Sequence, residues 1–328
     1  MEMRTIGGRE VSVLGVGGMS FCDFYGATDE AESHAVLDAA RDAGVTHIDT
    51  ANVYGAGKSE SAIGAWLASR GGRDGLFIAT KAGIARGIGA AAGSFNNAAD
   101  YLEAELDGSL KRLGVDHVDL FYIHRRDQSI PIEEVTATLA RLVEAGKTRA
   151  FGFSEISPAS LRRAAAVAPV AAVQSEYSLQ TRQPELGLLQ ACEALGTTLV
   201  AFSPVGRGML TDLPPDAGKY VDQPWMAANP RFMEPNLSAN LAATEPLRAL
   251  ARSLDVPTAA LALRWVYDQA GHIVAIPGTR SAARFKEYLA AERIPAAAME
   301  EVARLLPPGW AHGDRYSDAQ WAGPENYC

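Results

Sequence analysis

The stretch Thr28–Asp49, TDEAESHAVLDAARDAGVTHID, holds one complete helix-then-strand unit. Thr28 and the two acidic residues after it can cap and charge the first turn of a helix, and Gly44 can end that helix. The run Thr46–Asp49 that follows is short, largely apolar and β-branched, which is typical of a buried strand. The stretch therefore predicts a helix that delivers a strand with a carboxylate at its C-terminal end.

The same unit recurs along the whole chain. Eight short apolar runs alternate with segments of helical periodicity. The predicted strands are Leu14–Gly17, Thr46–Asp49, Leu76–Thr80, Val118–Ile123, Thr148–Gly152, Ala171–Gln174, Thr198–Phe202 and Ile273–Ile276. Strands that are apolar on both faces are typical of a parallel sheet covered by helices. Eight such units predict an α/β fold: a single (β/α)8 TIM barrel domain over residues 1–328.

Three segments lie outside this pattern. Residues 1–14 predict a β-hairpin that caps the barrel, with Gly7-Gly8-Arg9 turning between Met3–Ile6 and Val11–Leu14. Residues 204–240 form a long proline- and aromatic-rich loop after the seventh strand, which puts it on the C-terminal face of a barrel. Residues 307–328 form an irregular tail that contains tryptophans. Because exposing tryptophan side chains to water is unfavourable, we expect the tail to pack against the barrel mouth.

An open doubly wound sheet is the alternative fold. Its signature is G-x-G-x-x-G directly after the first strand. The run Gly15–Ser20, GVGGMS, lacks the last glycine, and a hairpin precedes it. The barrel is therefore the better prediction.

Composition limits the classes of partner. The net charge is −9 over 328 residues, which argues against a nucleic-acid partner because phosphate neutralisation needs a concentrated basic surface. No apolar run of 18 residues and no apolar leader occurs, so we expect neither a membrane span nor secretion, and a cytoplasmic location. Cys22, Cys192 and Cys328 lack metal-site or disulfide spacing, which predicts no metal. The oligomeric state is left open.

Four polar residues follow successive predicted strands in order. Asp49 ends the second strand, Tyr54 lies in the loop after it, Lys81 follows the third strand and His124 the fourth. Barrel closure would bring an acid, a phenol, an amine and an imidazole to one rim, a set able to transfer a proton to a carbonyl. Each residue alone is often structural, so the prediction depends on their combination.

Elementary electrostatics assigns roles to these residues. A free tyrosine has a pKa near 10. We expect the Lys81 ammonium to lower the pKa of Tyr54, with Asp49 holding the ammonium in place. His124 can hydrogen-bond the substrate oxygen. A hydride must come from a cofactor, since no side chain supplies one.

Several motifs make the chain similar to a known family. Gly44–Gly55 (GVTHIDTANVYG), Gly146–Ser154 (GKTRAFGFS) and Ile276–Arg280 (IPGTR) resemble signatures of the aldo-keto reductase superfamily. His124–Asp127 (HRRD) followed by Pro131–Glu134 (PIEE) resembles its bacterial and plant branch. The resemblance covers nearly the whole chain. It implies NADP(H) bound in extended form across the barrel mouth, and a catalytic tetrad of Asp49, Tyr54, Lys81 and His124.

The resemblance also implies a set of cofactor-binding positions. These are Gly18, Met19, Asp49, Ser154, Glu155, Gln174, Phe202, Ser203, Pro204, Val205, Gly206, Arg207, Gly208, Gly278, Thr279, Arg280, Arg284, Glu287 and Tyr288. Ser154 and Gln174 would hold the nicotinamide amide, and Glu155 stands where many relatives have asparagine. Phe202 would stack on the nicotinamide.

The remaining cofactor positions concern phosphate and adenine. The glycines beside Arg207 would permit close approach of the backbone while Arg207 neutralises phosphate. Arg280 and Arg284, at the start of a helix, would grip the 2′-phosphate and favour NADP over NAD. Tyr288 replaces a common asparagine, so the adenine would be stacked.

The expected substrate is a small carbonyl compound, reduced to an alcohol with Tyr54 as general acid. Predicted substrate-side residues are Phe21, Tyr25, His124, Arg125 and Trp225. Two alternatives stay open. One is the same fold working as a dehydrogenase of an alcohol, a sugar or a pyridoxal-type compound. The other is a cofactor-sensing regulatory subunit with little turnover.

Overall fold

The computed structural model describes residues 1–85, 94–216, 218 and 223–327. Its central sheet is built from short parallel strands. They are β3 (Val16–Gly17), β4 (His47–Asp49), β5 (Phe77–Ala82), β6 (Val118–Ile123), β7 (Thr148–Ser154), β8 (Ala172–Glu176), β9 (Thr198–Phe202) and β10 (Ile273–Ala275). Each strand pairs with its neighbours in sequence, from β3 to β10. The eight predicted strands are confirmed, with ends that shift by up to two residues.

The sheet closes on itself. Leu14 forms a parallel bridge with Ala275, and the Gly17 amide donates to the Pro277 carbonyl oxygen at 3.0 Å. The first strand therefore meets the last one. This closure confirms the (β/α)8 barrel and excludes the doubly wound sheet, whose edges stay open.

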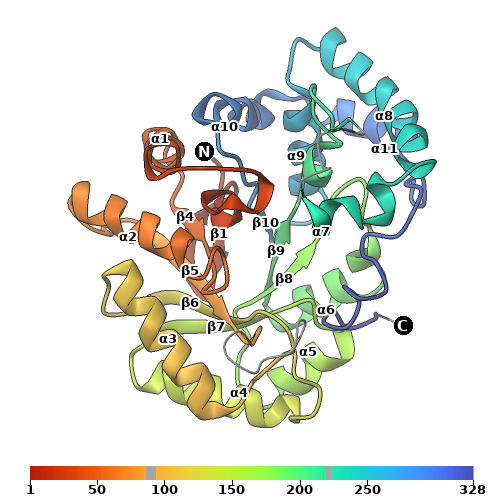
Figure 1. Ribbon diagram of the computed structural model, residues 1–328. Helices are drawn as coiled ribbons and strands as arrows, with labels where there is room; N and C mark the ends of the chain where they lie inside the picture. Colours follow the sequence, from red (N-terminus) through yellow and green to blue (C-terminus); the bar gives the residue numbers. More distant parts are fainter. Residues whose placement is uncertain (86–93, 217, 219–222, 328) are drawn as a thin grey trace.

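Helices surround the barrel, as Figure 1 shows. They are α1 (Glu30–Asp42), α2 (Lys58–Ser69), α3 (Ala99–Leu113), α4 (Ile132–Glu144), α5 (Pro158–Ala165), α6 (Leu188–Leu195), α7 (Pro224–Ala227), α8 (Asn236–Ser253), α9 (Thr258–Asp268), α10 (Ala282–Tyr288) and α11 (Ala297–Leu305). Gly114 and Gly196 end α3 and α6 in the left-handed conformation. The N-cap of α1 is Asp29 rather than Thr28, because the Asp29 carboxylate accepts from the Glu32 amide at 2.8 Å.

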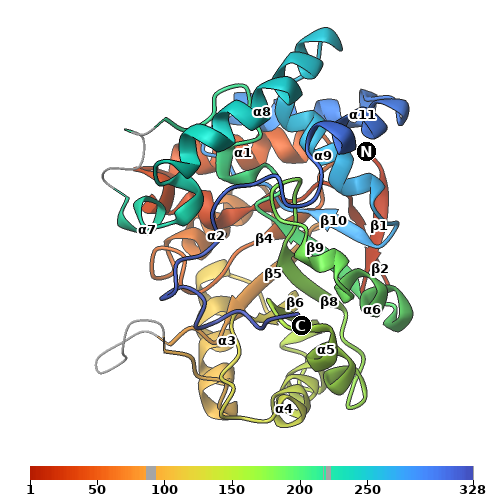
Figure 2. The same cartoon turned by 90° about the vertical axis from the view of Figure 1, so that its right-hand side faces the viewer.

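The N-terminal hairpin closes one end of the barrel. Its strands are β1 (Met3–Ile6) and β2 (Arg9–Ser12). Arg9 belongs to the second strand, not to the turn, because Gly7 and Gly8 both adopt positive φ and complete a two-residue turn. Figure 2 places the hairpin at the end opposite the loops that follow the strands. The hairpin therefore covers the end of the barrel that lies opposite the predicted site.

The predicted long loop is partly helical. Within residues 204–240 the structure has α7, two short 3₁₀ turns and the first residues of α8, which begins at Asn236. Residues 217 and 219–222 of this segment lie outside the described residues. The loop follows β9, so it belongs to the mouth as predicted.

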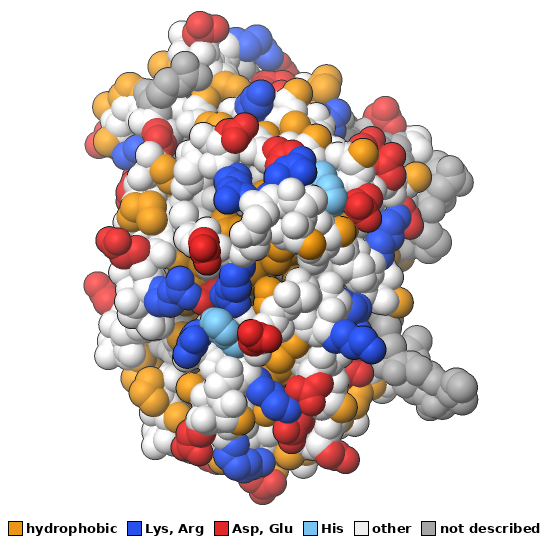
Figure 3. All heavy atoms as spheres, turned by 90° about the vertical axis from the view of Figure 1, so that its left-hand side faces the viewer, with side chains coloured by type: hydrophobic (Ala, Val, Ile, Leu, Met, Phe, Trp, Pro, Cys, Tyr) orange, Lys and Arg blue, Asp and Glu red, His pale blue; other side chains and the backbone are white. Residues whose placement is uncertain are grey.

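The surface and helices carry two further findings. Figure 3 shows acidic and basic side chains interspersed over the flank on the side of α1 and α2.

Within the part of the chain that the structure describes, no helix combines the length and apolar character needed to cross a bilayer.

Candidate active site at the barrel mouth

A buried ion pair lies at the C-terminal ends of β4 and β5. The Lys81 ammonium donates to an Asp49 carboxylate oxygen and, at 2.8 Å, to the Thr50 carbonyl oxygen. Lys81 is 0 % exposed and Asp49 is 2 % exposed. The register pairs Asp49 on β4 with Ala79 on β5. Side chains alternate along a strand, so Lys81, two residues after Ala79, points to the same side as Ala79 and lies nearer the mouth.

Tyr54 and His124 complete the predicted tetrad. The Lys81 Nζ lies 3.4 Å from the Tyr54 hydroxyl oxygen. The Tyr54 ring meets the His124 ring edge-on, with centroids 5.6 Å apart. His124 directly follows β6, and Tyr54 lies in the loop between β4 and α2. The structure therefore brings all four side chains together at one rim.

The predicted effect of Lys81 on Tyr54 is wrong. Burial raises the pKa of Tyr54 well above its usual range, and the negative charge of Asp49 adds to the rise, while the positive charge of Arg125 opposes it. Burial also raises the pKa of Asp49 and lowers the pKa of Lys81, and the attraction between the two opposes both shifts. Loss of water around the phenol outweighs the nearby ammonium.

Two of the predicted nicotinamide-binding residues contact the tetrad or its neighbours. The Gln174 amide nitrogen donates to the second Asp49 carboxylate oxygen at 2.8 Å. The Ser154 hydroxyl accepts from Arg125 at 3.1 Å. Gln174 lies in β8 and Ser154 ends β7, so both side chains are at the mouth. Gln174 thus fixes one oxygen of Asp49 while Lys81 takes the other.

Glu155 has a role that the sequence did not reveal. Its carboxylate forms a buried ion pair with Arg315 of the C-terminal tail and accepts from the Ser175 hydroxyl at 3.0 Å and the Glu176 amide at 2.8 Å. The expectation that Glu155 faces the nicotinamide is not met, because its side chain is committed to the tail. Its φ of 57° is left-handed, a region that asparagine tolerates better.

Glu176 is a third buried carboxylate of the mouth, after Asp49 and Glu155. Its oxygens lie 3.1 Å from Arg207, 3.5 Å from Arg231 and 3.7 Å from Arg315. The Arg207 guanidinium also lies 4.5 Å from the centre of the Trp225 ring. Arg207, predicted to neutralise phosphate, shares the single charge of Glu176 with Arg231 and Arg315.

Comparison with known proteins decides the family. Residues 13–306 match the model of the aldo/keto reductase family. The chain belongs to the aldo/keto reductase family. It is 36% identical over 318 residues to "Aldo-keto reductase yakc [NADP(+)]" of Schizosaccharomyces pombe, covering 95% of this chain and 94% of the relative. It is 36% identical over 319 residues to "Probable aldo-keto reductase 1" of Glycine max, covering 94% and 89%.

A solved structure agrees with this membership. The glycerol dehydrogenase of Gluconobacter oxydans superimposes with a TM-score of 0.80 at 27% identity, and the match covers 94% of this chain and 96% of that one. The barrel and its N-terminal hairpin therefore match the aldo/keto reductase fold.

Other predicted cofactor positions of this aldo/keto reductase line the mouth from β3 to β10. A Cβ on Gly18 would lie 2.9 Å from the Asp49 carbonyl oxygen, and one on Gly278 would lie 2.7 Å from the Ser20 hydroxyl, so both sites require glycine. Phe202 is half-buried at the end of β9. Further predicted positions with buried or half-buried side chains or backbone are Met19, Ser203, Pro204, Val205, Gly206, Gly208 and Thr279.

The residues predicted to bind the adenine and 2′-phosphate of the cofactor differ in their exposure. Arg280, Arg284 and Glu287 are exposed beside α10, and the Arg280 guanidinium donates to the Ala27 carbonyl oxygen at 2.6 Å. Tyr288 is only 5% exposed and packs edge-on against Phe285, with centroids 5.9 Å apart. Stacking of adenine on Tyr288 is therefore not supported, because the ring belongs to the core.

The predicted substrate-side residues divide into two groups. Phe21 is 1% exposed and belongs to the core, so it cannot form a substrate wall as expected. Tyr25 and Trp225 are half-buried at the mouth. The sequence missed Phe24, whose ring meets the Trp225 ring with centroids 5.2 Å apart.

The C-terminal tail supplies another residue missed as a site residue. The Tyr316 ring lies 6.2 Å from the Trp225 ring, and its hydroxyl oxygen lies 3.4 Å from Arg125. The tail is held by Arg315 and by Trp310, whose indole nitrogen donates to the Leu179 carbonyl oxygen at 2.7 Å. Its aromatic content predicted packing, but no local spacing placed Tyr316 beside Arg125.

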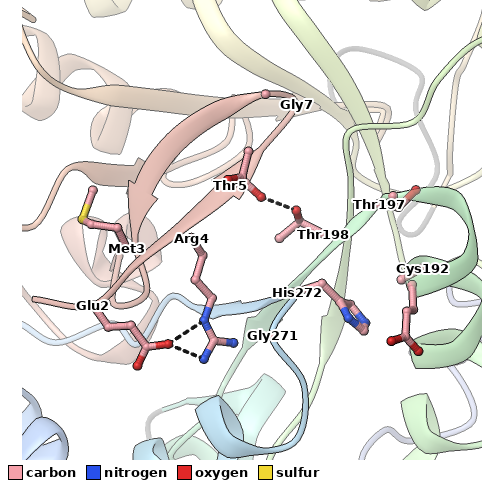
Figure 4. A pocket seen from close by; sticks show the side chains of 13 residues that line it. Glu2, Met3, Arg4, Thr5, Gly7, Cys192, Thr197, Thr198, Gly271 and His272 are labelled. Atoms are coloured by element: carbon pink, nitrogen blue, oxygen red, sulfur yellow. Dashed lines mark hydrogen bonds and ion pairs between the residues drawn. The ribbon is translucent and has the colours of Figure 1, made fainter.

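A hollow of about 510 Å³ lies at the opposite end of the barrel, between the hairpin and the loops before β9 and β10. Figure 4 shows Arg4 beside Glu2, and Thr5 beside Thr198. Arg4 also donates to the Ile273 carbonyl oxygen at 2.8 Å, and burial raises the pKa of the Cys192 thiol to about 12. Arg4 is already hydrogen-bonded to Glu2 and to the Ile273 carbonyl oxygen, and the Cys192 thiol stays protonated. The mouth, not this hollow, is the candidate active site.

Proposed function

We propose that this aldo/keto reductase reduces aldehydes or ketones to alcohols with NADPH, and that Tyr54 donates the proton. The observation that carries the proposal is the buried chain of Asp49, Lys81 and the Tyr54 hydroxyl at the mouth. The name of the fission-yeast relative includes NADP(+), which supports the cofactor.

The residues at the mouth fit a nicotinamide dinucleotide. The half-buried Phe202 at the end of β9 offers a ring for stacking on the nicotinamide. Arg280 and Arg284 are exposed and, among residues 1–85, 94–216, 218 and 223–327, have no carboxylate within ion-pair distance. These guanidinium groups suit the 2′-phosphate that distinguishes NADPH from NADH.

The chain's own residues perform the proton chemistry. A phenol whose pKa is raised by burial keeps its proton before the reaction, so Tyr54 enters the reaction in the protonated form that a proton donor requires. His124, beside Tyr54, is positioned to hydrogen-bond the carbonyl oxygen of a substrate. The bound cofactor supplies the hydride. After proton transfer the Lys81 ammonium, 3.4 Å from the Tyr54 oxygen, stabilises the phenolate, and Asp49 keeps Lys81 in place.

The reverse reaction is a second candidate. The structural similarity to a glycerol dehydrogenase favours it. In that direction Tyr54 would act as the base, which requires the phenolate that burial disfavours. Both directions use the same residues, since the Tyr54 phenol donates a proton in reduction and its phenolate accepts one in oxidation.

Replacing the hydroxyl of residue 54 tests the proposal. Tyr54→Phe should lower kcat for an aryl aldehyde by about 100-fold or more, because general acid catalysis typically contributes that much. NADPH binding, followed by fluorescence titration, should persist. Tyr101→Phe is the matched control, since Tyr101 lies on α3 and its hydroxyl contacts the Ile84 carbonyl oxygen. Equal activity of Tyr54→Phe and wild type would refute Tyr54 as the donor.

A further inference from the structure

Arg125 stands directly after His124 and brings a cation to the mouth. One nitrogen of its guanidinium donates to the His124 carbonyl oxygen at 2.6 Å and to the Ser154 hydroxyl at 3.1 Å. The other terminal nitrogen lies 3.4 Å from the Tyr316 hydroxyl. These three acceptors are neutral. The guanidinium has five N–H donors, so it can donate hydrogen bonds to further acceptors.

The charges around Arg125 are unbalanced. Of the buried carboxylates at the mouth, Asp49 pairs with Lys81, while Glu155 and Glu176 pair with Arg315, Arg207 and Arg231. Within the described part of the chain, no carboxylate oxygen lies within 4.0 Å of Arg125. Burying a guanidinium without a counter-charge is costly. The half-buried Arg125, which makes no ion pair of its own among the described residues, is therefore suited to an added anion.

Tyr316, which contacts Arg125, belongs to a cluster of aromatic rings that indicates the shape of that anion. The rings of Phe24, Trp225 and Tyr316 lie in edge-to-face contacts, and Trp225 joins the other two, with centroids 5.2 and 6.2 Å away. Aromatic walls suit a flat apolar body. Tyr54, the proposed proton donor, lies beside His124 on the same rim.

We propose that the enzyme prefers carbonyl substrates that carry a carboxylate, and that the Arg125 guanidinium binds this carboxylate while the carbonyl faces Tyr54 and His124. The proposal rests on the proposed function for the reaction itself. A planar fork of N–H donors matches the two oxygens of a carboxylate. The positive charge of Arg125 also acts at Tyr54, because it opposes the rise in the pKa of Tyr54.

The experiment compares matched aldehydes. We would measure kcat/KM with NADPH for 4-carboxybenzaldehyde and 3-carboxybenzaldehyde against their methyl esters. Wild type should favour at least one acid over its ester by about tenfold or more, as expected of a charge-assisted hydrogen bond. Arg125→Met should reduce that ratio at least about tenfold, mainly through KM for the acid. Arg163→Met is the control, because Arg163 is an exposed arginine paired with Glu133, and it should keep the wild-type ratio.

Binding of 4-(hydroxymethyl)benzoate, measured by calorimetry with NADP⁺ present, separates the two proposals. If no aldehyde is reduced but this carboxylate binds and Arg125→Met abolishes its binding, the substrate class stands and the proposed reaction fails. Equal ratios for wild type and Arg125→Met would overturn the substrate class while leaving the reaction intact. A loss of NADPH affinity in Arg125→Met as large as the loss for the acid would also overturn it, since Arg125 would then serve the cofactor.

Discussion

At the scale of single residues, the site depends on how a few buried charges are shared. Asp49 gives one oxygen to Lys81 and the other to Gln174. A hydrogen bond from a neutral amide favours the charged carboxylate, and burial alone raises the pKa of Asp49. Gln174 was expected to hold the cofactor, but its contact with Asp49 makes it a candidate positioning residue for the tetrad as well.

Gln174→Met tests this role. Loss of the amide donor should raise the pKa of Asp49 further, because the charged form loses a partner. Asp49 would then be neutralised at a higher pH and would release Lys81, so the acid limb of the kcat profile should move to higher pH by about one unit. Gln190→Met, at an exposed glutamine on α6, is the control. An unchanged profile with weaker NADPH binding would mean that Gln174 serves the cofactor alone.

At the scale of elements, the C-terminal tail is joined to the residues that follow β7, chiefly through Glu155. The Glu155 carboxylate pairs with Arg315, and its carbonyl oxygen accepts from the Glu325 amide at 2.8 Å. Both partners of the ion pair are almost fully buried. The tail carries Tyr316, so docking of the tail also builds one wall of the mouth.

Arg315→Met should lower the free energy of unfolding by about 3 kcal/mol, because it leaves a buried carboxylate without its counter-charge. Adding Glu155→Gln should restore part of that loss, since the orphaned charge is then removed. Denaturant titration of both single variants and the double variant gives the coupling energy. Arg163→Met, at an exposed ion pair, should cost less than about 1 kcal/mol. Strictly additive losses would show that the two side chains are not coupled.

At the scale of the whole molecule, barrel closure collects residues from the entire chain at one mouth. The proposed proton donor lies after β4, whereas the exposed Arg280 and Arg284 lie after β10. Closure makes β3 and β10 neighbours, which places both ends of the chain of strands around one opening. An extended dinucleotide suits that arrangement, with its reactive ring at the tetrad and its 2′-phosphate at the arginines.

Replacing both arginines tests that orientation. Arg280→Ala together with Arg284→Ala should weaken NADPH binding by about tenfold or more and NADH binding much less, because only NADPH carries the 2′-phosphate. Dissociation constants for both cofactors provide the measurement. Lys286→Ala, an exposed cation on the same helix, should preserve the preference for NADPH. Equal weakening of both cofactors would contradict the proposed contact with the phosphate.

The sequence by itself determined the order of strands and helices and the meeting of the tetrad residues. Apolar periodicity and helix-ending glycines are local signals, and parallel strands in a closed barrel must present their ends at one rim. Element ends such as Arg9 and Asn236 were shifted by turn geometry and by helix starts that no strong local signal marks.

Only the tertiary structure decided which charged side chains pair and which side chains are shielded from solvent. Glu155 and Arg315 lie 160 residues apart, and the pKa of Tyr54 follows from burial rather than from Lys81. Phe21 and Tyr288 belong to the core although their positions in the sequence suggested contact with ligands. Ion pairing and desolvation depend on which distant segments come to share a low-dielectric space, and that is set when the barrel closes and the tail docks over its mouth.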